Sequence, residues 1–126
     1  MSSITAEPTG RPLPGEYAAY LEPDLDQVGG DDAVTALETG REAVLEVFAE
    51  LTDARMAGVR YATDKWTLKE ILGHLIDDER IFVGRALAIA RRDQRPLTGF
   101  DEKGYAAEAA SEARPLAALL TEYRAV

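Results

Sequence analysis

The stretch KWTLKEILGHLIDDERIFVGRALAIARRDQRPLTGF, from Lys65 to Phe100, decides the fold. Its apolar residues recur at helical spacing, and both ends of one long helix can be read from it. Thr67 and Glu70 form a capping box, in which each side chain accepts a hydrogen bond from an end N–H group. Basic residues suit the carboxyl end of a helix, and Pro96 prevents its continuation. The sequence therefore predicts a helix from residue 67 to about Arg91.

Two further helices are predicted, one on each side of this stretch. The first follows a turn and runs from Ala33 to about Leu51, and the last runs from about Ser111 to the chain end. Pro115 is compatible with the last helix only in its first turn, because proline lacks an N–H group. We expect residues 52–64 to connect helices and residues 93–108 to be mostly loop. No period-two alternation of strands is present, so the sequence predicts an all-α protein.

The domain organisation follows from length and from the placement of proline and glycine. A chain of 126 residues has room for one hydrophobic core. Four of the six prolines lie among the first 23 residues, which predicts an extended arm over residues 1–30. We therefore expect one domain over residues 1–126, with the helical bundle at residues 31–126. The last helix ends in the middle of its apolar pattern, so we expect the bundle to be incomplete at the carboxyl end.

Composition excludes several classes of function. The net charge is −9, with 23 acidic and 14 basic residues, whereas a general nucleic-acid binder needs a basic surface. There is no cysteine, which excludes disulfides, a thiolate nucleophile and cysteine-based zinc sites. The sequence shows neither a secretory signal nor an apolar run that could span a membrane. We expect a cytoplasmic protein that binds neither nucleic acid nor membrane.

The long predicted helix carries the only histidine, His74, with acidic residues one turn further on. Asp78 is four residues along, so both side chains lie on one helix face and can reach one metal ion or one proton. Glu79 falls within the predicted apolar stripe, where a carboxylate needs a partner. From these residues alone, the favoured interpretation of His74 is a half-buried side chain hydrogen-bonded to a neighbour, and that of Asp77 is a solvated acid.

A specific set of motifs lies in and around the long predicted helix. It consists of a tryptophan before the helix start, the Gly73-His74-Leu75 triplet, Asp77 and Glu79 after it, and the loop PLTGFD. With them, the chain resembles the DinB-like family of bacterial metal-binding four-helix bundles. The opening RPLPGEYAAY and the closing RPLAALLTEYRAV are also similar to that family, so the resemblance covers nearly the whole chain.

The resemblance implies an up-down helical bundle, of which three helices are readable here and the fourth is expected to be missing. In the family, three histidines bind one divalent metal, commonly nickel or zinc. His74 matches one of them, while the other two belong to an HxxxH-type pattern on a fourth helix that this sequence lacks. Asp78 and Glu79 are candidates for hydrogen-bonding to His74 without binding the metal themselves. No catalytic residue can be named. We expect metal binding by this chain to be weak or absent.

Two classes of function remain open. Characterised relatives include thiol-dependent S-transferases and a mycothiol-dependent isomerase, which implies a metal-dependent transferase or hydrolase acting on a small molecule. A metal with an open coordination position lowers the pKa of a bound thiol and so generates the nucleophile. The alternative is a non-catalytic, stress-linked bundle that forms a homodimer or binds another partner.

Overall fold

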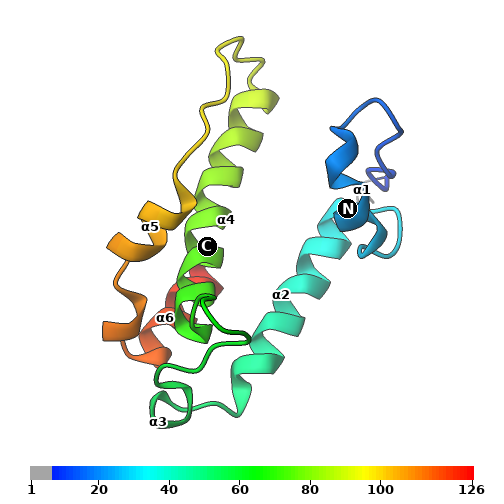
Figure 1. Cartoon of the computed structure of the whole chain (residues 1–126). Coiled ribbons are helices and arrows are strands. Elements are labelled where there is room, and N and C mark those ends of the chain that lie inside the picture. The colour runs from blue at the N-terminus through cyan, green and yellow to red at the C-terminus, as the bar shows by residue number, and fades with distance from the viewer. Residues whose placement is uncertain (1–6) are drawn as a thin grey trace, which may run out of the picture. The chain divides into compact units, whose positions relative to one another are not determined.

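The long helix of the computed structural model, α4 (Leu68–Ala90), has the predicted bounds (Figure 1). Thr67 Oγ1 accepts a hydrogen bond from the Glu70 N–H at 3.1 Å, and Glu70 Oε2 accepts one from the Thr67 N–H at 2.7 Å. The capping box is therefore confirmed. The structure describes residues 7–126. The regular elements in this range are helices, with no strand, which confirms the all-α class. Contacts divide the chain into two units, residues 1–50 and 51–126.

The first unit contains a 3₁₀ turn, η1 (Ala19–Leu21), and the helices α1 (Glu22–Asp26) and α2 (Ala33–Ala49). Asp32 caps α2 by accepting a hydrogen bond from the Thr35 N–H at 2.9 Å. The preceding arm is tied to the turn between α1 and α2, because Arg11 donates to three carbonyls there. Its guanidinium lies 2.7 Å from the oxygen of Leu25, 2.6 Å from that of Val28 and 2.9 Å from that of Gly30.

In the second unit, two segments predicted as connections contain short helices. Residues 52–64 include α3 (Asp53–Met56), and residues 93–108 include α5 (Glu102–Glu108). Residues 93–108 are mostly loop, as predicted, but both short helices were missed for the same reason: they are too short to show an apolar stripe. The signal that was available is the N-cap, because Thr52 and Asp101 each accept a bond from the N–H three residues on.

The predicted last helix is divided in two. A 3₁₀ turn, η2 (Ser111–Ala113), precedes α6 (Leu116–Ala125), and Pro115 is the N-cap of α6 rather than a first-turn residue. Proline disfavours helical backbone in the residue before it, and Arg114 is accordingly extended, with ψ at 142°. The α5, η2 and α6 segments all contact α4 (Figure 1).

The apolar core of the second unit is small and lies at the amino-terminal half of α4. Met56, Leu72, Ile76 and Leu119 are each no more than 1% exposed. Helical spacing predicts that Leu72, Phe82 and Ile89 all lie on the apolar stripe of α4. The prediction is correct for Leu72 but wrong beyond residue 80, because Phe82 and Ile89 are 55% and 66% exposed. Among residues 68–90, the buried ones all lie between 69 and 76.

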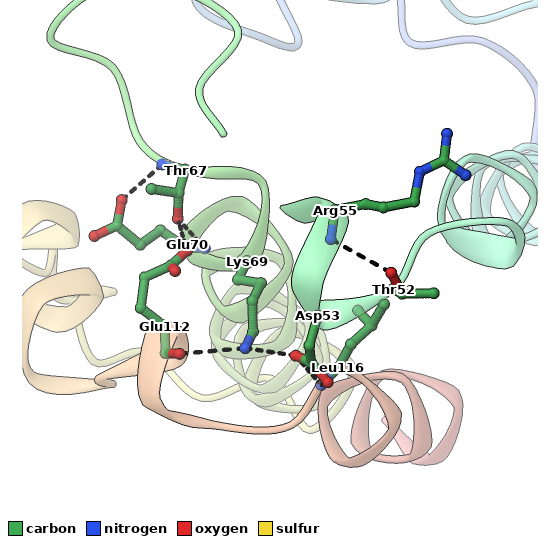
Figure 2. A network of polar contacts seen from close by, with 8 residues as sticks. All are labelled: Thr52, Asp53, Arg55, Thr67, Lys69, Glu70, Glu112 and Leu116. Atoms are coloured by element: carbon green, nitrogen blue, oxygen red, sulfur yellow. Dashed lines mark hydrogen bonds and ion pairs between the residues drawn. The ribbon is translucent and has the colours of Figure 1, made fainter. Parts of the chain in front are cut away.

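Beside this core lies a polar network around the buried Lys69 (Figure 2). The Lys69 ammonium, on a residue only 5% exposed, donates to Asp53 Oδ1 at 2.9 Å and to the Glu112 carbonyl at 3.2 Å. Asp53 also accepts from the Leu116 N–H, at 3.0 and 3.2 Å. The ammonium beside Asp53 holds the pKa of that carboxyl below its usual range. The network therefore joins α3, α4, η2 and the start of α6.

Gly73 is the point of closest approach between α4 and the η2 turn. A Cβ added there would lie 2.0 Å from Ser111 Oγ, and Ser111 is only 2% exposed. Gly84, on the same helix, has no atom within 4 Å of the corresponding position. A side chain is thus excluded at one glycine of α4 and free at the other.

We predict that Gly73→Ala lowers the free energy of unfolding by about 2 kcal/mol, because the methyl group overpacks a closed contact. Gly84→Ala should instead raise it by about 0.8 kcal/mol, the helix-propensity difference between the two residues. Urea denaturation of both variants measures these changes. Adding Ser111→Ala to Gly73→Ala should restore part of the loss, and equal effects of the two alanines would contradict the close approach.

Candidate functional site

The candidate site is built on the amino-terminal half of α4, around His74. The His74 side chain is 18% exposed, and its Nε2 atom lies 3.2 Å from Asp78 Oδ2, one helical turn away. The ring of Trp66 lies against the imidazole, with a centroid separation of 4.7 Å and an interplanar angle of 49°. His74 is thus half-buried beside a neighbouring carboxylate, as the sequence predicted. Trp66 and Asp78 together fix the orientation of its ring.

The Asp78 carboxylate is only partly satisfied. Its Oδ1 atom is buried and accepts no hydrogen bond from any group among residues 7–126. Burial raises the pKa of Asp78; the His74 charge opposes this rise, the charges of Glu102 and Asp77 add to it, and that of Arg85 opposes it. An unsatisfied buried oxygen is costly, so this position favours a proton or a cation beside the carboxylate.

The other acidic residues of this turn are placed differently. Glu79 was predicted to lie in the middle of the core stripe, but it is only half-buried, and no ion pair forms to it from residues 7–126. The prediction of a buried, paired carboxylate was therefore wrong, because burial of α4 is confined to residues 69–76. Asp77 is half-buried as well. The structure brings Asp78, and not Glu79, to His74.

Arg85 lies on α4 eleven residues after His74, and sequence reasoning missed the groups that surround it. Arg85 Nη2 donates to the Thr98 carbonyl at 2.8 Å. Its guanidinium carbon lies 5.0 Å from the ring centroid of Phe82 and 5.9 Å from that of Phe100. Phe100 in turn lies 5.3 Å from the ring of Tyr105 on α5. The segment that returns from α4 to α5 therefore passes along the flank that carries the site.

This arrangement, a helix-borne histidine and carboxylate inside an all-α fold, can be compared with known families. The sequence model of the DinB superfamily matches residues 10–126. The chain belongs to the DinB superfamily. Neither the curated proteins nor the solved structures gave a match. Membership of the DinB superfamily confirms the resemblance and supports the helical-bundle fold.

The described part of the chain fits one side of the metal site that DinB-like proteins imply. The His74 imidazole offers one donor atom, and the Asp78 carboxylate, which contacts its Nε2 atom, can orient it. No group of three or more His, Cys, Asp or Glu side chains within residues 7–126 is arranged to hold a metal ion. Zinc sites generally use at least three protein ligands, so these residues need further donors.

The raised pKa of Asp78 leads to a prediction about pH. Above the ordinary carboxyl pKa of 3.8, the unfolded chain releases this proton while the folded chain keeps it. The stability contributed by Asp78 is therefore present at lower pH and lost as the pH rises through its folded-state pKa. We predict that wild type loses stability relative to Asp78→Asn over this window.

Urea denaturation of wild type and Asp78→Asn between pH 3 and pH 6 measures the difference. Glu108→Gln, which removes an exposed carboxylate from α5, is the control. A stability difference between wild type and Asp78→Asn that stays constant with pH would show that Asp78 titrates normally.

Proposed function

We propose that this DinB superfamily member is a metal-dependent enzyme acting on a small molecule, either a thiol-dependent S-transferase or a hydrolase. The observation that supports this best is the oriented pair of His74 and Asp78, with one buried carboxylate oxygen unsatisfied. Nickel or zinc is the proposed cofactor. We keep the cytoplasm as the proposed location, which suits a chain without cysteines.

The residues of the chain prepare the site for such a cofactor. Asp78 orients the imidazole through Nε2, and Trp66 covers one side of the ring. A carboxylate behind a histidine ligand fixes its orientation and raises its basicity, which strengthens metal binding. The bound metal would supply an open coordination position that lowers the pKa of a substrate thiol.

A second candidate, a non-catalytic bundle that dimerises or binds a partner, rests on a different observation. Phe82, Val83, Leu87 and Ile89, all on the carboxyl-terminal half of α4, are each more than half exposed. Exposed apolar side chains grouped on one element are typical of association surfaces. No helix in the described range is long and apolar enough to cross a membrane.

We predict that the 126-residue chain binds nickel or zinc weakly, because one imidazole with a supporting carboxylate leaves a divalent ion short of ligands. Elemental analysis after dialysis should find less than one metal ion per chain. Titration calorimetry should show the remaining affinity reduced at least about tenfold by His74→Ala, and about tenfold by Asp78→Asn. Asp77→Asn is the control and should leave the affinity unchanged.

The same titrations separate the two candidates. Wild-type affinity in His74→Ala would contradict a role for His74 in metal binding and favour the non-catalytic bundle. Metal-dependent consumption of a low-molecular-weight thiol by wild type, lost in His74→Ala, would support the enzyme. Stoichiometric metal that survives dialysis of the monomer would contradict the expectation of weak binding.

A further inference from the structure

Arg85 has a guanidinium that the fold holds in place. The Thr98 carbonyl accepts one of its N–H groups, and the rings of Phe82 and Phe100 lie within cation–π distance. Arg85 is half-buried, although it lies in the half of α4 whose apolar side chains are exposed. A guanidinium fixed in this way loses little conformational entropy when it binds a ligand.

The Arg85 charge acts on Asp78, but no carboxylate among residues 7–126 lies within ion-pair distance of this guanidinium. By contrast, Arg80, Arg95 and Arg114 each pair with one. Its planar fork keeps further N–H donors beyond the one used by Thr98, in the geometry that a carboxylate or phosphate accepts. An oriented, unpaired and half-buried guanidinium is suited to recognising an anion.

The position of Arg85 relates it to the candidate site. His74, Asp78 and Arg85 share one flank of α4, since offsets of four and eleven residues differ from whole turns by only about 40° and 20°. Along the axis, His74 and Arg85 are separated by about 16 Å. Both side chains lean toward the amino terminus, and the Arg85 side chain is the longer of the two, which shortens this gap. An extended small molecule can therefore reach both residues.

We propose that Arg85 recognises a carboxylate group of the substrate, while the reacting end of the same molecule lies at His74. The substrate class is then an elongated organic acid, such as a thiol that carries a carboxylate at the far end. A singly charged carboxylate is favoured over a doubly charged phosphate, because the net charge is −9 and the Asp78 and Glu102 charges act on the same flank. The reacting end at His74 rests on the proposed function, whereas anion binding at Arg85 does not require a metal.

The test is an NMR titration of the full chain, free of metal, with S-methylglutathione, an extended thioether with carboxylates at its ends. Its diethyl ester, in which both carboxylates are masked, is the matched probe, and phenyl phosphate tests the phosphate source. The Arg85 side-chain Nε–H and the indole N–H of Trp66, the only tryptophan, are the reporters. Arg85→Gln removes the charge. The control, Arg91→Gln, removes the same charge from an exposed position six residues further on, at the carboxyl-terminal cap of α4.

We expect the acid to shift the Arg85 signal saturably and the ester to shift it at least about tenfold more weakly, as loss of a charge-assisted hydrogen bond implies. Arg85→Gln should lose the same factor and Arg91→Gln should stay within about twofold of wild type. Arg85→Lys should fall between Arg85→Gln and wild type, because it keeps the charge without the fork. Thermal melts check that each variant is folded, and Arg85→Lys carries the test if Arg85→Gln is not.

Several outcomes would overturn the proposal. They are no saturable binding of the acid by wild type, equal binding of acid and ester, tighter binding of phenyl phosphate, or equal losses in Arg85→Gln and Arg91→Gln. Because no metal is present, these results do not depend on the metal titrations of His74. A chain that binds metal through His74 but fails here would keep the proposed function and lose only the role of Arg85.

Discussion

The buried ammonium of Lys69 is the constraint on which the second unit depends. A charge that is only 5% exposed must be compensated, and the compensation comes from Asp53 on α3 and from the Glu112 carbonyl on η2. Asp53 also caps α6 through the Leu116 N–H. Three short pieces of chain, α3, η2 and the first residues of α6, are thereby fixed around the start of α4, where Met56, Leu72, Ile76 and Leu119 form the core. The apolar core stabilises the unit, and the polar network selects one arrangement of its helices.

The candidate site inherits its rigidity from the same end of α4. Trp66 comes just before the capping box, and Gly73, next to His74, is held against Ser111. The imidazole therefore projects from a part of α4 whose residues before and after His74, such as Gly73 and Ile76, are buried. Asp78 lies one turn beyond His74, where the side chains are only partly buried. Its Oδ1 atom is nevertheless buried and accepts no hydrogen bond from the described residues. The cost of that oxygen is the kind of local penalty that proteins retain where a proton, an ion or a ligand is to be bound.

Membership of the DinB superfamily establishes the family of the fold and leaves the reaction to be found. The two functional classes use different halves of α4. The enzyme proposal rests on the amino-terminal half, with His74 and Asp78. Arg85, on the same flank of the helix, adds a proposed binding group for a substrate carboxylate. The association proposal rests on the apolar side chains that are exposed after residue 80. Both halves belong to one continuous helix, so an enzyme that also associates through α4 would be physically consistent.

The sequence by itself determined the all-α class, the bounds of α2 and α4, and the face shared by His74 and Asp78. Each of these depends on short-range chemistry, namely helical periodicity, an Asp or Thr cap, and a spacing of four residues. Only the tertiary structure decided the rest. Glu79 and Phe82 fit the apolar stripe of α4, but burial depends on which elements pack against the helix, and no residue of α4 after Ile76 is fully buried. The Lys69 network, the Gly73–Ser111 contact and the Phe100 ring beside Arg85 join residues 15 to 63 positions apart, and no local pattern encodes such separations.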